Sequence, residues 1–249
     1  MLTAVNKMKD FIIIPTYNER GNISRLIPRI FQLYPDINVI VVDDSSPDGI
    51  AEEVKKLMQK YPNLELNSRP RKLGLGTAYI QTFQKLLNEH GDIRSITEMD
   101  ADFSHAPETI KTFLKEIDNF DLVIGSRYMP GGSVKNWSIF RKVLSRGGNI
   151  YAKMVTGIPI NDLTAGFKCY RAGLLRKYDF NFIHSNGYAY QIEMKNIAWR
   201  LGAGIKEIPI TFTERIEGVS KISGNIIYEG IIAPWRIRFS TSPGRTNHI

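Results

Sequence analysis

Short apolar runs alternate with longer segments of mixed polarity over the first half of the chain. The runs lack the polar alternation of a half-exposed strand, so we expect the buried strands of a parallel sheet. The longer segments place apolar residues at helical spacing, and this alternation is typical of an α/β fold with helices on both faces of the sheet. The expected strands are 11–14, 39–42, 64–67, 93–99 and 121–125, and the expected helices are 22–33, 47–61, 76–88 and 107–117.

Two segments of the second half, 137–156 and 224–239, combine apolar residues at helical spacing with interspersed Arg and Lys. Phe140 and Tyr151 lie on the apolar side of the first segment, and Arg141 interrupts it. Such a segment is either an amphipathic helix that lies on a membrane surface or a helix that packs its apolar face on the core. The pattern fits both interpretations.

Composition and charge narrow the class of protein. A chain of 249 residues with 43% hydrophobic and 23% charged residues is long enough for one sizeable core, and we expect one domain. Residues 1–134 hold 16 Lys and Arg against 18 Asp and Glu, whereas residues 135–249 hold 17 against 7. The basic half suits a polyanionic partner such as a phosphorylated substrate or an anionic membrane, although a solvated basic surface gives the same counts. We expect no nucleic-acid partner, because the strands lack interleaved aromatic and basic residues.

Several common chemistries find no support in the sequence. The first ten residues lack the apolar core of a signal peptide, and no run of about 18 apolar residues occurs, so we expect a cytoplasmic protein. The single cysteine, Cys169, excludes an intramolecular disulfide and a Cys-based metal site. Its apolar neighbours favour a buried side chain over a nucleophile. The four histidines do not cluster, and no Ser-His-Asp or Cys-His pattern indicates nucleophilic hydrolysis.

Polar residues gather where three expected strands end, at 15–19, 43–46 and 100–102. Ligands bind at the carboxyl ends of parallel strands, so we expect a site at this edge. Asp100 and Asp102 suit Mg²⁺ or Mn²⁺ that bridges to substrate phosphates, although acidic residues also fill ordinary turns.

Asp43 and Asp44 at the second strand end suit donors on a ribose or a base. The alternative is that this strand end only caps the helix that begins near Pro47.

Cationic and glycine-containing segments are candidates for phosphate binding. Lys72 to Gly76 would let the backbone approach a phosphate, but it lacks the Gly-Lys-Ser/Thr of a P-loop. Arg127 follows another strand end, and its forked charge suits phosphate. Arg215 and Lys221 lie in a segment that resembles a mobile lid with two cations, and an exposed charged loop is the ordinary alternative.

Taken in order, these clusters resemble the family-2 glycosyltransferases, and within them the polyprenol-phosphate (dolichol-phosphate) mannose synthases. The resemblance runs from Pro15 to about Phe239, and the motifs at 162–167 and 209–215 look most like the bacterial members. The other motifs that carry it are Pro15-Thr16-Tyr17-Asn18-Glu19-Arg20, Val42-Asp43-Asp44-Ser45-Ser46-Pro47-Asp48-Gly49, Leu73-Gly74-Leu75-Gly76, Met99-Asp100-Ala101-Asp102-Phe103-Ser104-His105, Gly125-Ser126-Arg127-Tyr128 and Gly218-x-Ser220-Lys221.

The resemblance implies a GT-A (nucleotide-diphospho-sugar transferase) fold, which is a Rossmann-like, mostly parallel sheet with helices on both faces, followed by C-terminal amphipathic helices. It implies one domain over 1–239, in which 1–134 bind nucleotide and metal and 135–239 face the acceptor and the membrane. Residues 240–249 are expected to form a flexible tail.

The resemblance also implies roles for individual residues. Asp102, Arg127 and Lys221 are the expected catalytic residues, and Asp100, Asp102 and Ser104 the expected metal ligands, although relatives often carry Gln at the position of Ser104. The acceptor phosphate is expected to bind Arg127, Arg141, Arg215 and Lys221. The nucleotide sugar is expected to bind Pro15, Tyr17, Glu19, Val42, Asp44, Asp100, Ala101, Asp102, Arg127, Arg215 and Lys221.

The implied activity is that of a dolichyl- or polyprenyl-phosphate β-D-mannosyltransferase. It would move mannose from GDP-mannose to polyprenyl phosphate with inversion and would use Mg²⁺ or Mn²⁺. Relatives often carry C-terminal transmembrane helices, so we expect peripheral association with the cytoplasmic face of a membrane, with or without a separate transmembrane subunit. One alternative is the transfer of glucose or another sugar from a UDP-sugar to the same lipid. Another is a non-catalytic nucleotide-sugar binding subunit. A third is a degenerate scaffold subunit, which the intact Asp100, Asp102, Arg127 and Lys221 argue against.

Overall fold

The strand β1, Lys9–Thr16, divides the hydrophobic core into two layers. Its β-branched residues favour a strand, and successive side chains alternate between the two faces. Phe11 and Ile13 pack in one layer, and Ile12 and Ile14 pack in the other. Both faces of β1 are therefore buried, as its uninterrupted apolar run predicts. The computed structural model describes residues 8–183, 185, 187–214 and 224–240.

Seven strands form the main sheet in the order β3-β2-β1-β4-β7-β5-β8. All neighbours are parallel except β7, which is antiparallel to both β4 and β5. The expected mostly parallel sheet is confirmed. Its other strands are β2 Asn38–Asp43, β3 Leu64–Ser68, β4 Ile93–Glu98, β5 Leu122–Ser126, β7 Lys168–Arg171 and β8 Ile205–Pro209, and β6 Ser133–Lys135 pairs with β9 Thr211–Thr213 in a separate parallel ribbon.

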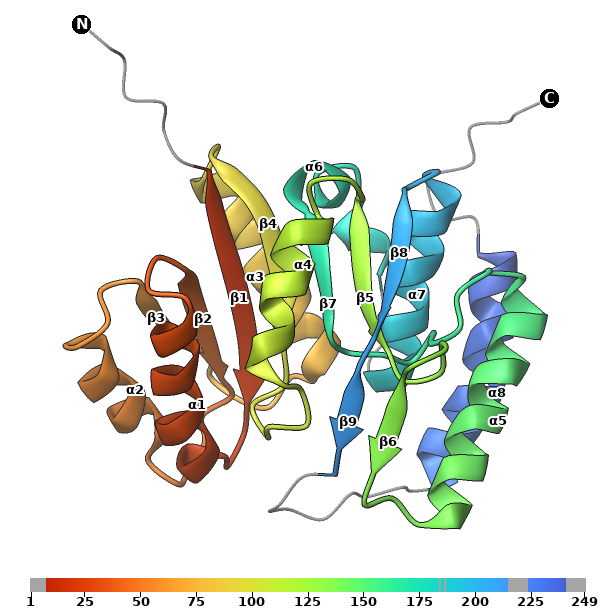
Figure 1. Ribbon diagram of the computed structural model, residues 1–249, viewed down its shortest axis with the longest axis horizontal. Coiled ribbons are helices and arrows are strands. Elements are labelled where there is room, and N and C mark those ends of the chain that lie inside the picture. Colours follow the sequence, from red (N-terminus) through yellow and green to blue (C-terminus); the bar gives the residue numbers. More distant parts are fainter. Residues whose placement is uncertain (1–7, 184, 186, 215–223, 241–249) are drawn as a thin grey trace, which may run out of the picture.

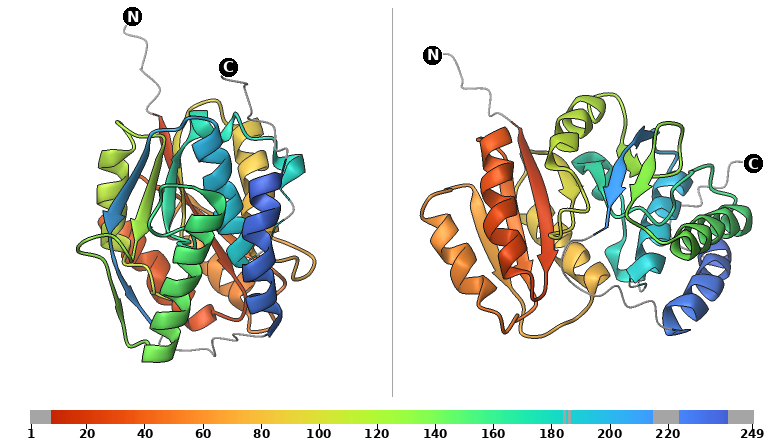
Figure 2. Two further views of the ribbon diagram at one scale, coloured as in Figure 1. Left: turned by 90° about the vertical axis from the view of Figure 1, so that its right-hand side faces the viewer. Right: turned by 60° about the horizontal axis from the view of Figure 1, so that its bottom comes forward.

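Helices cover both faces of the sheet (Figures 1 and 2). The first helix, α1, buries Ile23, Leu26, Ile27 and Ile30, which lie at the spacing of one helical stripe. It shares its core layer with α2 and α4, whereas α3, α6 and α7 pack on the opposite face. The bounds are α1 Arg20–Leu33, α2 Ile50–Met58, α3 Leu75–Glu89, α4 Ile110–Glu116, α6 Ala172–Leu175 and α7 Gly187–Arg200, with short 3₁₀ helices η1 Pro107–Thr109 and η2 Phe180–Phe182.

The helix expected over 47–61 begins later than predicted. Gly49 has a φ of +79°, which is outside the helical region, so α2 starts at Ile50. The carboxylate of Asp48 accepts a hydrogen bond from the Ile50 amide at 3.3 Å and another from the Arg20 amide at 2.9 Å. Asp48 therefore caps a turn that joins the starts of α1 and α2.

The helices α5, Ile139–Thr156, and α8, Gly224–Phe239, pack against each other (Figure 2). The Tyr151 hydroxyl donates to the Ile231 carbonyl and accepts from the Trp235 indole, both at 2.8 Å. α5 begins two residues later than expected, because the Ser138 hydroxyl caps it. Among the described helices, none is long and apolar enough to cross a membrane.

Candidate active site

The carboxyl ends of β1, β2 and β4 meet at one edge of the sheet, the lower edge in Figure 1. Thr16 pairs with Asp43 across β1 and β2, and Ile13 pairs with Glu98 across β1 and β4. The three polar strand ends of the sequence are therefore neighbours in space.

A cavity of about 620 Å³ opens at this edge and continues toward α5 and α8. It brings together seven of the predicted site residues, which are Pro15, Glu19, Asp100, Ala101, Asp102, Arg127 and Arg141. Its wall toward α5 and α8 is largely apolar and aromatic, and contains Trp137, Leu144, Tyr151, Phe212 and Ile231. The predicted residues Arg215 and Lys221 lie outside the described residues.

Asp100 and Asp102 lie at one end of this cavity, in a turn that the following residues hold in place. Phe103 adopts a left-handed conformation with φ of +60°, and the Ser104 amide then donates to the Asp102 carboxylate at 3.0 Å. Within the described part of the chain, no group of three or more acidic, His or Cys residues forms a metal cage by itself. Two carboxylates at an open cavity instead fit a hard divalent cation whose remaining ligands are substrate oxygens and water.

His105 holds the same turn in place by a hydrogen bond to its backbone. Its Nδ1 accepts a hydrogen bond from the Asp100 amide at 3.2 Å, and its Nε2 lies 3.8 Å from the Asp100 carboxylate. The ring stacks on Phe167 at 4.6 Å between centroids. Burial lowers the pKa of His105, although the charge of Asp100 partly opposes this, so the imidazole stays neutral at neutral pH. With Nδ1 as an acceptor, Nε2 carries the proton on the side of Asp100.

Arg127 lies at the centre of the cavity with its charge already paired. Its Nε and Nη2 donate to the two oxygens of Asp162, each at 2.7 Å, and Nη2 also donates to Thr164 at 2.8 Å. Burial by itself lowers the pKa of Arg127, but the Asp162 carboxylate outweighs it and raises the net pKa. Burial likewise raises the pKa of Asp162, but the charge of Arg127 outweighs it and the net pKa is lowered. The sequence marks Asp162 only as part of a motif and misses its role as partner.

Arg141, on the first turn of α5, also has an acidic partner. Its guanidinium pairs with Glu214, which follows β9, and its central carbon lies 4.2 Å from the centroid of Trp137. Arg127 and Arg141 therefore share an aromatic neighbour, because the Arg127 guanidinium also lies over the Trp137 ring, 5.7 Å from its centroid.

The hydrogen-bond partner of Asp44 is Arg69, a residue that the sequence does not single out. Arg69 is buried and donates from Nε to the Asp44 carboxylate at 2.6 Å. The same guanidinium donates to Thr77 at 3.0 Å and to the Gly74 carbonyl at 3.2 Å. Arg69 thus ties the second strand end to the glycine turn, and no pattern distinguishes it in sequence from the neighbouring cations Arg71 and Lys72.

Three other predicted residues lie apart from the cavity wall. Tyr17 is exposed, with the Lys72 ammonium 4.4 Å from its ring centroid. The Val42 side chain packs in the core, which leaves only its backbone to contact a ligand. Ser104 is buried, and its hydroxyl has no hydrogen-bond partner among the described residues. Metal binding by Ser104 stays a prediction.

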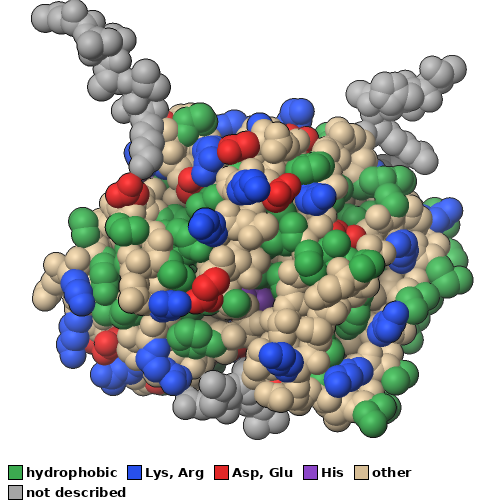
Figure 3. Space-filling model, in the orientation of Figure 1, with side chains coloured by type: hydrophobic (Ala, Val, Ile, Leu, Met, Phe, Trp, Pro, Cys, Tyr) green, Lys and Arg blue, Asp and Glu red, His purple; other side chains and the backbone are tan. Residues whose placement is uncertain are grey.

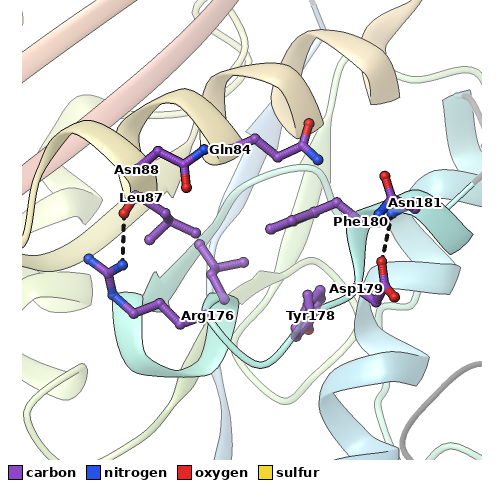
Figure 4. Close-up of a pocket in the computed structure, with 9 residues that line it drawn as sticks. Gln84, Leu87, Asn88, Arg176, Tyr178, Asp179, Phe180 and Asn181 are labelled. Carbon is purple, nitrogen blue, oxygen red and sulfur yellow. Dashed lines mark hydrogen bonds between the residues drawn. The ribbon is translucent and has the colours of Figure 1, made fainter.

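A second, smaller pocket of about 370 Å³ lies between α3 and the segment around α6 and η2 (Figure 4). It is at the opposite edge of the sheet, and its Arg176 donates to the Leu87 carbonyl at 2.8 Å. None of the predicted site residues line it.

Residues 11–179 match the family model described as glycosyl transferase family 2. The chain belongs to this family. It is 42% identical over 234 residues to the polyprenol monophosphomannose synthase of Mycolicibacterium smegmatis, with 92% of this chain and 88% of that protein covered. It is 41% identical over 225 residues to the undecaprenyl-phosphate mannosyltransferase of Micrococcus luteus, with 90% and 92% covered.

Solved structures agree with the fold. Glucosyl-3-phosphoglycerate synthase from Mycobacterium tuberculosis, in complex with Mn²⁺, uridine diphosphate and glucosyl-3-phosphoglycerate, superposes with a TM-score of 0.65 at 16% identity. The match covers 93% of this chain and 80% of that one. The complex of the same enzyme with Mn²⁺, uridine diphosphate and phosphoglyceric acid gives a TM-score of 0.66. At this identity the likeness shows the fold alone, and the expected GT-A fold is confirmed.

Proposed function

We propose that the chain transfers mannose from GDP-mannose to the phosphate of a polyprenyl phosphate. The observation that carries the proposal is the polarity of the cavity: two carboxylates lie at one end, two arginines project into it, and an apolar wall leads from it to α5 and α8. A phosphorylated head with a long apolar tail matches that order. Support for the sugar and the lipid comes from the two relatives, which are named for mannosyl transfer and for polyprenyl acceptors.

The donor would lie along the strand ends. The carboxylates of Asp100 and Asp102 would hold a divalent cation, as Mn²⁺ accompanies the nucleotide in the structural neighbours. When bound, that cation neutralises the diphosphate that leaves. The backbone near Pro15 and Val42 and the carboxylates of Glu19 and Asp44 would contact the nucleoside.

The acceptor phosphate would lie between the arginines and the sugar. Its second pKa is about 6, so it is largely dianionic at neutral pH and needs no strong base. One phosphate oxygen forms a bond to the anomeric carbon while the bond from that carbon to the diphosphate breaks, which inverts the configuration and releases GDP. Arg127 and Arg141 would position the phosphate and stabilise its charge, with Arg215 and Lys221 as further proposed contacts.

The acceptor would enter from a membrane surface. Exposed apolar side chains lie along α5, at the lower right of the molecule, with Lys and Arg among them (Figure 3). The helix α8 also exposes apolar side chains. An apolar surface with basic residues is typical of peripheral binding to an anionic bilayer. We propose that the expected association with the cytoplasmic face of a membrane uses α5 and α8, and a separate transmembrane subunit is the alternative. The residues are Ile139, Phe140, Val143, Ile150, Met154, Ile231, Ile232, Trp235 and Phe239.

Radiolabel transfer tests the reaction and the donor together. The purified chain is incubated with detergent-dispersed polyprenyl phosphate, Mg²⁺ or Mn²⁺, and labelled GDP-mannose, with labelled UDP-glucose in parallel. Metal-dependent label in the organic extract from GDP-mannose alone is the expected result. Label from UDP-glucose alone would contradict the mannose assignment, and no lipid label from either donor would contradict the proposed reaction for the isolated chain.

A further inference from the structure

A buried charge pair lies beneath the cavity floor. Lys168 on β7 donates from Nζ to the Glu98 carboxylate on β4 at 2.5 Å, and both side chains are fully buried. Tyr190 donates to the other oxygen of Glu98 at 3.0 Å. Removing two charges from water is costly, and such a pair gives little net stability. We therefore expect Lys168 and Glu98 to have a role other than stabilising the fold.

The same ammonium fixes the direction of a cavity side chain. Lys168 also donates to the Oε1 atom of Gln191, a residue of α7 that lines the cavity. An amide oxygen only accepts, and a lysine nitrogen donates whether it is charged or neutral. Oε1 of Gln191 must therefore face Lys168, and its Nε2 donor is turned away from the charge pair.

Nε2 faces a small space beside the acidic turn. A methyl group built on Gly166 would lie 3.6 Å from Nε2 of Gln191, 3.8 Å from Cε1 of His105 and 3.9 Å from Oδ2 of Asp100. All four residues line the cavity. Gly166 thus leaves room where a neutral N–H donor and a carboxylate oxygen converge. The Gln191 side chain is buried, at a relative exposure of 3%.

We propose that Gln191 binds a hydroxyl group of the transferred sugar, with its Nε2 as the donor and the Asp100 carboxylate as the acceptor. A hydroxyl is both donor and acceptor, so one group satisfies both neighbours. A phosphate oxygen fits less well, because it has no proton to donate to Asp100 and would satisfy only Gln191. Lys168 and Glu98 are positioning residues that act through Gln191. The inference rests on the proposed function, because it requires a nucleotide-sugar donor in this cavity.

The test separates sugar contact from nucleotide contact. Gln191→Met keeps the length of the side chain and removes the amide. With Mn²⁺ present, we expect kcat/KM for the nucleotide sugar to fall about 10-fold or more, since a site loses one hydrogen bond to its substrate. The Kd for GDP should stay within about twofold, because GDP lacks the sugar. Asn196→Leu is the matched control, since Asn196 is buried on the same helix away from the cavity wall.

A second variant keeps the experiment decisive if Gln191→Met does not fold. Gln191→Glu preserves the acceptor for Lys168 and replaces the N–H donor with oxygen, so the same split between GDP and nucleotide sugar is expected. Unchanged kcat/KM in both variants would overturn the proposal. A loss of GDP affinity as large as the loss of kcat/KM for the nucleotide sugar would also overturn it. So would an effect limited to a higher KM for the acceptor.

Failure of the proposed function is a different result. If the wild-type chain transfers glucose from UDP-glucose and no mannose, the mannose assignment falls, and the comparison is made with UDP-glucose and UDP. If the wild-type chain transfers neither sugar, the two donors and their diphosphates are compared by calorimetry. Equal changes in affinity for donor and diphosphate would then overturn the role of Gln191.

Discussion

The guanidinium of Arg127 and the carboxylate of Asp162 form a two-pronged ion pair in which both residues are buried. The Asp162 carboxylate also accepts the Arg127 amide at 2.9 Å, so the end of β5 and the loop before β7 are joined at three points. The arginine is therefore oriented before any phosphate arrives, and less ordering remains for the substrate to impose.

Asp162→Asn tests this orientation. Asparagine keeps the shape but leaves a buried guanidinium without its counter-charge, so we expect the free energy of unfolding to fall by about 3–5 kcal/mol. Denaturant titration measures it. Glu108→Gln removes an exposed pair with Arg29 and should change stability by less than about 1 kcal/mol. Equal effects of the two substitutions would contradict the role of Asp162.

Asp102→Ala tests the acidic turn. It removes a proposed metal ligand together with the acceptor of the Ser104 amide, so transferase activity should fall by about 100-fold or more at saturating Mn²⁺. Asp118→Ala, which removes an exposed partner of Arg94, serves as the control and should retain activity. Full activity of Asp102→Ala at saturating Mg²⁺ or Mn²⁺ would refute the metal role.

Gly76→Ala tests why the first turn of α3 contains a glycine. The added methyl would lie 2.7 Å from the Ser185 carbonyl and 3.1 Å from the Tyr190 ring, so stability should fall by about 1–3 kcal/mol. Gly91→Ala, which meets nothing within 4 Å, is the control in the same thermal unfolding experiment. A variant as stable as the control would contradict this steric explanation of Gly76.

The exposed surface of α5 is tested by vesicle flotation. Phe140 and Met154 are 74% and 76% exposed, and inserting an apolar side chain into lipid gains up to about 1.5–3 kcal/mol. Replacing both with Ser should weaken partition into phosphatidylglycerol vesicles by about tenfold or more and leave folding intact. Met8→Ser, another exposed methionine, should have no effect. Unchanged flotation of the α5 variant would exclude this surface.

Cys169 predicts a pH dependence of stability. Burial raises the pKa of its thiol from 9.0 to about 11, so the folded state holds a proton that the unfolded state loses above pH 9. The raised pKa contributes about 2–3 kcal/mol to the free energy of unfolding. This contribution is complete below pH 9 and disappears as the pH rises to 11. The difference in unfolding free energy between wild type and Cys169→Ala should narrow over that range. A constant difference would show that the thiol ionises equally in both states.

Much of the fold can be predicted from local patterns of apolar and polar residues. The uninterrupted apolar run of β1 and the stripe of α1 report burial directly, and their positions follow from the sequence to within two residues. The clusters of polar residues at the strand ends can also be recognised in the sequence, because polar residues that follow buried strands have few structural reasons to occur together. The direction of β7 cannot be predicted in this way. The same four residues could form a parallel or an antiparallel strand, and only the pairing with the rest of the sheet decides which direction the strand takes.

The partners of the site residues are harder to predict. Arg69 and Asp44 are 25 residues apart in sequence, and Lys168 and Glu98 are 70 apart. A long-range pair leaves no periodic signal, because each member looks like a surface charge in its own segment. The sequence therefore singles out Asp100, Asp102 and Arg127, which line the cavity, but not the roles of Asp162, Arg69 and Lys168 as partners.

The reversed direction of β7 brings two kinds of segment to the cavity. Segments that leave β1 and β4 line it, whereas the loop with Thr164 and Gly166 enters it on the way into β7. That loop is anchored at a strand's beginning, so it can vary in length or residue without moving the carboxyl ends of the parallel strands. Under the proposed function, the part of the cavity that meets the sugar can in this way change while the strand ends that would meet the nucleotide keep their positions.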